Sequence, residues 1–223
     1  MKKLERKHPL AIRWFHWINF PILFGMIYTG LLIYWAYDPY RIGLGAFTLF
    51  HFFPDWFYNI LGLPHRLSEG MAWHFFLMWT FTINGFLYVA YTVVSGEWRY
   101  LVPNRHSFRD AMEVTLYDLG LRKQLPPQSK YNGAQRIAYS GIVAMGFGSL
   151  VTGLAIYKYV QFAWIARLLG GYQAARLEHF LLTMGYLFFF LVHISQVIRA
   201  GWNNFRAMIT GYEIRVEERR RVH

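Results

Sequence analysis

The chain has 223 residues, of which 55% are hydrophobic and 16% are charged, and it contains no cysteine. Four uncharged windows are each long enough to cross a bilayer, which excludes an ordinary soluble domain and predicts an integral membrane protein. Without cysteine the chain has no disulfides, no thiolate-bound iron–sulfur cluster and no covalently attached or thiolate-ligated haem.

The first window follows a basic N-terminus. The apolar run is too long for a signal peptide and no small-x-small cleavage site follows it, so we expect an uncleaved first span. We predict spans at about residues 14–37, 70–96, 137–157 and 178–199, with a tail over 200–223. The expected fold is an all-α four-helix bundle that forms a single membrane domain over residues 1–223.

Two loops between the predicted spans carry signals of their own. The first, about residues 38–69, is long and aromatic, and Pro54 and Pro64 break it. We expect short helices on the membrane surface or a docking face there, although a bilayer-hugging loop without a partner explains the same residues. In the loop between the second and third spans, Ser107-Phe108-Arg109-Asp110 resembles a capping box and Gly120 ends the predicted interfacial helix. We find no internal repeat.

Lysine and arginine gather on one side of the predicted spans. Of the 23 such residues, five precede the first span, seven lie between the second and third, and six lie from Arg199, at the end of the fourth span, onward. Cytoplasmic loops carry an excess of these residues, so both termini are predicted to lie in the cytoplasm. The net charge of +11 is therefore a topology signal and does not indicate nucleic-acid binding.

Four histidines lie inside or at the edge of the apolar windows, where titratable groups usually mark function. They are His16, His74, His179 and His193. The predicted topology places His16 and His193 toward the cytoplasm, and His74 and His179 near the outer surface. His179 and His193 are 14 residues apart, which separates them by about 21 Å along one helix face. The four residues therefore form two pairs at two depths.

Two imidazoles at one depth suit haem iron, because neutral imidazole is a standard axial ligand. We predict two electron-carrying haems, one between His16 and His193 and one between His74 and His179. A polar anchor at a helix end explains any one of these histidines taken singly. His51 and His65, in the first external loop, are the next candidates.

Three cations lie at the ends of predicted spans near these histidines. Arg13, Arg176 and Arg199 are candidate partners for haem propionates. Each is equally explained as a cation at the membrane edge. Glycines within the spans would make room for a flat macrocycle or allow ordinary close helix packing.

The residues around the histidines resemble those of bacterial dihaem b-type cytochromes, the membrane subunits of formate dehydrogenase, nickel–iron hydrogenase and thiosulfate reductase complexes. The matching pieces are Arg13-Trp14-Phe15-His16-Trp17, Ala72-Trp73-His74, Arg176-Leu177-Glu178-His179 and Leu191-Val192-His193. Lys130-Tyr131-Asn132-Gly133-Ala134-Gln135-Arg136 resembles a K-Y-N-x-x-Q-K/R stretch of the formate dehydrogenase gamma and thiosulfate reductase branches. A long first external loop and the lack of a fifth span favour the thiosulfate-reductase-like branch.

The resemblance implies a four-helix bundle in the bacterial inner membrane, with two bis-histidine haems b and a quinone site beside the cytoplasmic haem. Asn132 and Gln135 would line that site for menaquinone or ubiquinone, although the same amides could cap a helix. The implied partners are membrane lipid, quinone and a periplasmic molybdenum-type oxidoreductase or hydrogenase, contacted directly or through an iron–sulfur subunit.

We therefore expect a subunit that passes electrons between the quinone pool and an outer-face oxidoreductase, with no substrate chemistry of its own beyond quinone redox. One alternative is a histidine-lined transporter, which would need acidic partners inside the membrane, and the four uncharged windows contain no Asp or Glu. The other alternative is a haem-free membrane anchor. A visible spectrum of the purified protein separates these functions.

Overall fold

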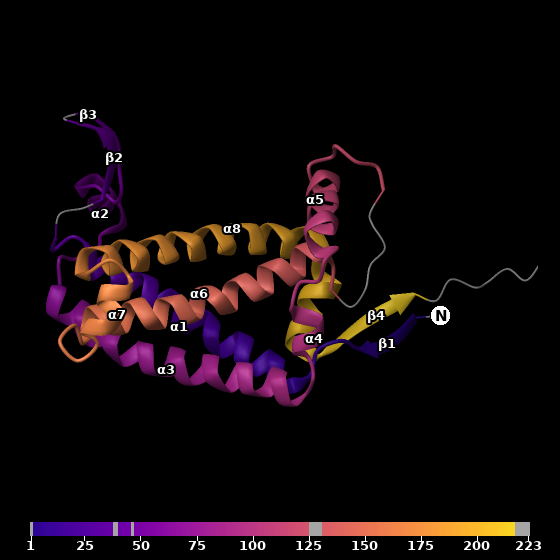
Figure 1. Cartoon of the computed structure of the whole chain (residues 1–223). Coiled ribbons are helices and arrows are strands. Elements are labelled where there is room, and N and C mark those ends of the chain that lie inside the picture. The colour runs from indigo at the N-terminus through magenta and orange to yellow at the C-terminus, as the bar shows by residue number, and fades with distance from the viewer. Residues whose placement is uncertain (1, 38–39, 46, 125–130, 217–223) are drawn as a thin grey trace, which may run out of the picture. The chain divides into compact units, whose positions relative to one another are not determined.

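The computed structural model describes residues 2–37, 40–45, 47–124 and 131–216. In this part of the chain, four helices are long and apolar enough to cross a membrane, and helix is the main element (Figure 1). The predicted all-α membrane class is confirmed. The chain divides into a first unit, Trp14–Asn84, and a second unit, Met1–Arg13 with Gly85–His223. The single membrane domain over 1–223 stays a prediction.

The first unit contains most of α1 (Leu10–Tyr34) and the first part of α3 (Leu67–Val94). The two helices approach closely at Gly70, where an added Cβ would lie 2.7 Å from the Cβ of Leu32. Glycine permits this approach because it has no side chain to overlap the facing helix. Farther along α3, the buried side-chain amide of Asn84 donates to the carbonyl of Phe15 at 3.2 Å. These contacts hold together the helix pair that carries His16 and His74.

A strand hairpin and a short helix connect α1 to α3. β2 (Arg41–Leu44) pairs antiparallel with β3 (Phe47–His51), and α2 (Asp55–Leu61) follows. The expectation of short helices is confirmed for α2 and wrong for the hairpin, where aromatic and β-branched residues surround a turn with Gly45 at φ 60°. Tyr58 of α2 is buried, and its hydroxyl donates to the carbonyl of Leu31 at 2.7 Å. This bond ties the connection to the end of α1.

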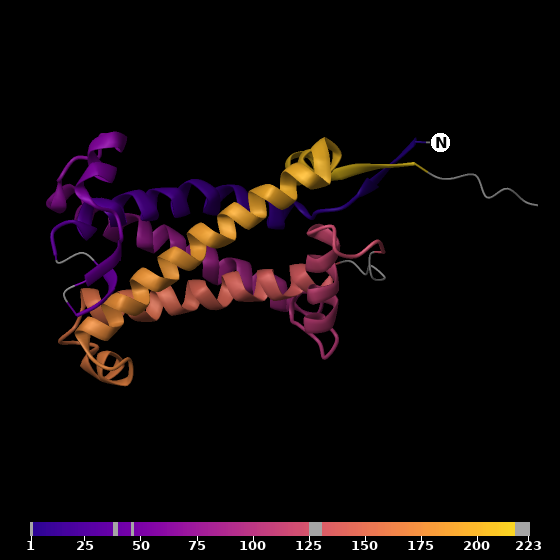
Figure 2. The same ribbon diagram turned by 90° about the horizontal axis from the view of Figure 1, so that it is seen from above.

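The second unit is built on α6 (Gly133–Tyr157) and α8 (Tyr172–Thr210), which lie side by side (Figures 1 and 2). Between them, α7 (Ala163–Leu168) packs into a buried cluster of small and branched side chains: Ala155, Ile165, Ala166 and Ala175. Gly201 interrupts α8 with φ 76° and ψ 176°. The tail predicted from residue 200 therefore begins with a separate helical segment.

Smaller elements gather at the ends of the long helices of the second unit. They are α4 (Trp98–Leu101), α5 (Ser107–Asp118), β1 (Lys2–Arg6) and β4 (Tyr212–Val216). The helix predicted from Ser107 is confirmed, and it ends before Gly120, whose φ is 74°. β1 and β4 pair antiparallel, with Lys2 opposite Val216. The sequence analysis did not predict this pairing, because its partners come from opposite ends of the chain.

Candidate functional site

His74 of α3 is held by a threonine of α1. The Nδ1 atom of His74 lies 2.9 Å from the hydroxyl oxygen of Thr29, a residue that is only 4% exposed. The same hydroxyl donates to the carbonyl of Gly25, one turn earlier in α1, at 2.7 Å. A threonine hydroxyl has one hydrogen, and the Gly25 carbonyl can only accept. The hydroxyl therefore accepts from His74, so Nδ1 carries the proton and Nε2 carries the lone pair.

His179 of α8 has the same environment in the second unit. Its Nδ1 lies 2.8 Å from the hydroxyl oxygen of Thr152 in α6, which is 3% exposed. That hydroxyl donates to the carbonyl of Gly148 at 2.8 Å. The same reasoning therefore assigns the proton of His179 to Nδ1. Metal-bound imidazoles usually donate their second N–H to an oxygen in this manner, which fixes the ring and its tautomer.

A glycine borders each imidazole. An added Cβ on Gly30 would lie 3.8 Å from Cε1 of His74, and one on Gly153 would lie 3.5 Å from Cε1 of His179. The edge of each ring therefore sits against bare helix backbone. An imidazole with a hydrogen-bonded Nδ1 and a glycine beside its ring fits the ligation of a flat iron macrocycle through Nε2.

These two environments belong to an internal repeat that the sequence analysis missed. The pattern F-G-x-x-x-T-G-L-x-I-Y occurs at residues 24–34 and again at 147–157. α1 and α6 both have 25 residues, with the threonine at the same position in each. His74 and His179 are both the eighth residue of their helices. Alignment of the chain against itself would have found Thr29 and Thr152, which otherwise look like ordinary members of apolar windows.

The two copies differ at their other ends. His16 is the seventh residue of α1, and Tyr139 is the seventh residue of α6. His193 is the twenty-second residue of α8, and Tyr88 is the twenty-second residue of α3. The ring of His193 stacks on Phe189 at 5.7 Å between centroids, and the ring of His16 meets Trp17 edge-on at 5.0 Å. Each copy therefore supplies one histidine and one tyrosine at this end.

The four predicted ligands are distributed over both units. His16 and His74 belong to the first unit, and His179 and His193 belong to the second. Their pairing across the two units therefore stays a prediction. Among the residues that the structure describes, no three His, Asp or Glu side chains converge as a non-haem metal site would require.

The three predicted propionate partners all have protein contacts. Arg13 donates to the carbonyl of Thr210 at 3.1 Å, and Arg176 donates to the side chain of Gln173 at 3.3 Å. Arg199 forms an ion pair with Asp118 at 3.2 Å and also donates to its backbone carbonyl. Arg199 thus fastens the end of α5 to α8. A propionate at any of these cations would have to share it with these partners.

Asn132 and Gln135 form the cap of α6. The side-chain oxygen of Asn132 accepts from the backbone N–H of Gln135 at 2.8 Å, and that of Gln135 accepts from the N–H of Asn132 at 3.1 Å. This reciprocal capping box begins the helix at Gly133, four residues before the predicted span. The cap uses both amide oxygens, so the amide N–H groups are the atoms that a quinone carbonyl would need.

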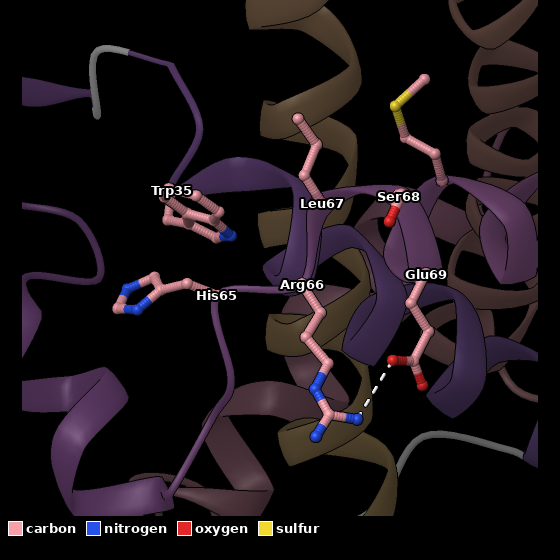
Figure 3. A pocket seen from close by; sticks show the side chains of 7 residues that line it. Trp35, His65, Arg66, Leu67, Ser68 and Glu69 are labelled. Atoms are coloured by element: carbon pink, nitrogen blue, oxygen red, sulfur yellow. Dashed lines mark hydrogen bonds and ion pairs between the residues drawn. The ribbon is translucent and has the colours of Figure 1, made fainter.

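His65, a reserve candidate from the sequence, lies in an aromatic stack of the first unit. Its ring stacks on Tyr58 at 5.4 Å and meets Trp35 at 4.6 Å. Burial raises the pKa of Tyr58 to about 12, so this phenol is neutral at physiological pH. Beside the stack, a cavity of about 570 Å³ is lined by Trp35, His65, Arg66, Leu67, Ser68, Glu69 and Met71 (Figure 3). Arg66 and Glu69 form an ion pair at its edge at 3.2 Å.

Two comparisons with known proteins bear on this arrangement. The sequence profile of the prokaryotic cytochrome b561 family matches residues 7–211. A relative from Azospira oryzae, named "Putative protein-methionine-sulfoxide reductase subunit YedZ1", is 30% identical over 197 residues. That alignment covers 88% of this chain and 92% of the relative. The profile match includes all four candidate ligands and both threonines.

Proposed function

Because the chain belongs to the prokaryotic cytochrome b561 family, and is therefore a multi-pass bacterial membrane protein that transfers electrons through haem b, we propose that it binds two haems. His74 and His179 ligate the outer haem, and His16 and His193 ligate the inner haem. Both termini lie in the cytoplasm, as the excess of Lys and Arg in these segments indicates.

The observation that carries this proposal is the duplicated threonine–histidine bond. Thr29 and Thr152 each accept from Nδ1 of a histidine, which leaves Nε2 of that histidine as the donor atom for iron. A polar anchor at a helix end would need no such fixed tautomer. The presence of the same threonine–histidine hydrogen bond twice in one chain supports the assignment of both histidines as iron ligands.

The inner pair is supported by its counterparts in the repeat. Tyr88 and Tyr139 occupy the positions equivalent to His193 and His16, and both belong to the second unit. By the repeat, we propose that the seventh residue of α1 and the twenty-second residue of α8 form the corresponding pair. Arg13 adds to this inference, because its bond to Thr210 joins the start of α1 to the end of α8.

Bound haem b accepts and releases one electron at a time. Two imidazoles for each iron would leave no coordination position open for oxygen or another small molecule, so the bound group would only carry electrons. The threonine bonds hold the outer imidazoles in one orientation, which limits the rearrangement that accompanies each transfer.

Electrons pass between membrane quinone and an oxidoreductase on the outer face. At the cytoplasmic side, the side-chain N–H groups of Asn132 and Gln135 would donate hydrogen bonds to a carbonyl oxygen of the quinone. The quinone is menaquinone or ubiquinone. The name of the Azospira relative favours a reductase as the outer partner. A molybdenum-type oxidoreductase or a hydrogenase, reached through an iron–sulfur subunit or directly, remains within the same proposal.

The test is the haem content and reducibility of the purified full-length protein. We expect two haems b per chain by the pyridine haemochrome assay, and reduction of both by a quinol analogue. A transporter or a haem-free anchor would give a colourless preparation. One haem per chain, or haems that dithionite reduces and quinol does not, would contradict the dihaem or the quinone part respectively.

A further inference from the structure

The threonine hydroxyls that hold His74 and His179 have a consequence for the haem potential, beyond orientation. We propose that Thr29 and Thr152 are matched positioning residues that lower the reduction potential of the outer haem. This inference rests on the proposed ligation of that haem by His74 and His179. Thr29 and Thr152 thereby receive a role, and the sign of their effect on the reduction potential is fixed.

The donated hydrogen bond changes the electron density of the ligating ring. An imidazole that donates its Nδ1–H becomes more electron-rich at Nε2, because the N–H bond is polarised toward the acceptor. A more basic axial ligand stabilises ferric iron more than ferrous iron. Each bond therefore makes the haem harder to reduce, and hydrogen bonding around the ligands is one of the means by which a protein sets a haem potential.

The surroundings make these bonds effective. Both hydroxyls are buried, so water does not replace them as partners of the imidazole. Each hydroxyl is itself fixed by donation to a carbonyl one turn earlier, at Gly25 or Gly148, and this second bond strengthens its capacity to accept. The distances of 2.9 Å and 2.8 Å are those of good hydrogen bonds.

The inner ligands provide an internal reference. His193 stacks on the ring of Phe189 and His16 meets Trp17, and both contacts lie outside the threonine motif. A change at Thr29 or Thr152 should therefore move one haem and leave the other as it was. A general loss of stability would move both.

The experiment is a redox titration of the full-length protein in detergent, followed at the haem α-band. The variants are Thr29→Val, Thr152→Val and their combination, which keep the shape of the side chain and remove the hydroxyl. Thr29→Ser and Thr152→Ser keep the hydroxyl. Thr92→Val is the matched control, because Thr92 is equally buried and its hydroxyl bonds to the carbonyl of Val89 in its own helix.

We expect each valine variant to shift the reduction equilibrium of the outer haem in favour of the ferrous state by a factor on the order of ten. That factor corresponds to about 59 mV for a one-electron couple. The double variant should shift it further, the serine variants and Thr92→Val should titrate as the parent protein, and the low-spin ferric EPR signal of one haem should change. Loss of the outer haem in the valine variants and its retention in the serine variants would also support the positioning role.

Two results would overturn the inference. The first is two haems with unchanged potentials in the valine variants. The second is an equal effect of valine and serine, which would assign the role to packing and not to the hydroxyl. A parent protein without haem would instead refute the proposed function, so the two failures are distinguishable.

Discussion

The chain contains two versions of the same helix pair, α1 with α3 and α6 with α8. At one end both place a histidine on the second helix against a threonine and a glycine of the first helix. At the other end the first pair has His16 and Tyr88, and the second pair has Tyr139 and His193. The two versions share the threonine and glycine that support the proposed outer ligand. They differ in which helix carries the second histidine, so the inner haem that we propose would take one histidine from each pair.

The packing of the two versions also differs. Gly70 of α3 faces Leu32 of α1, whereas Ala175 and Ala155 occupy the equivalent positions in α8 and α6 and share a buried cluster. The first pair therefore has leucine opposite glycine where the second pair has two alanines. An added Cβ at Gly70 would lie 2.7 Å from the Cβ of Leu32, so the first pair would have to shift to accommodate one.

The largest expected effect comes from giving the first copy the residue of the second. His16→Tyr should lower the haem content from two to one per chain, because it removes a proposed ligand of the inner haem. The new residue is the one that α6 has at the equivalent position, Tyr139. The matched control is Tyr139→Phe at the equivalent position of α6. This variant should keep both haems, because Tyr139 is not among the proposed ligands. Haem content by pyridine haemochrome decides the result. Equal loss in both variants would contradict the assigned difference between the copies.

A smaller effect is expected at the close approach of α1 and α3. In Gly70→Ala the new methyl group would meet Leu32 and force the helices apart beside Thr29, at a cost of about 1–3 kcal/mol. In Gly85→Ala, within the same helix, the new methyl group meets nothing within 4 Å, so this variant should be neutral or slightly more stable than the parent. Thermal unfolding and the occupancy of the outer haem measure both variants. A neutral Gly70→Ala would show that the approach is not needed.

The four spans and the helix at Ser107 could be predicted from sequence, because apolar length and helix-capping residues are local signals. The ligand role of the four histidines stays a prediction. The pairing of β1 with β4 could not be predicted, since nothing local connects residues at opposite ends of a chain. The roles of Thr29 and Thr152 could not be predicted from single positions either, because a threonine in an apolar helix has many roles. Only the repeated motif around the two threonines distinguishes them. Asn132 and Gln135 cap α6, which is one of the two roles expected of these amides, and their quinone role stays a prediction.

The smallest effect concerns α5, which has no counterpart in the first copy. Glu113 lies within 3.1 Å of Arg109 and 3.2 Å of Arg122, and the hydrogen bond from Arg109 is the main cause of its lowered pKa. A lowered folded-state pKa stabilises the fold above the unfolded value of about 4.3, and this contribution is lost as the pH falls through the folded value.

The protection factors of the α5 amides, corrected for the intrinsic pH dependence of exchange, should therefore fall at acidic pH in the parent protein. In Glu113→Gln this pH dependence should be weaker, because the amide does not titrate. Exchange of α6 amides in the same samples provides the control. An identical acid response in the parent and the variant would remove Glu113 from the explanation.

The most direct measurement of the central claim is the haem content of His74→Ala, His179→Ala and the double variant. If the two histidines grip the same iron, each single variant loses one haem and the double variant loses no more, so all three retain one haem per chain. A double variant with no haem, or single variants that lose different haems by their spectra and potentials, would contradict the account.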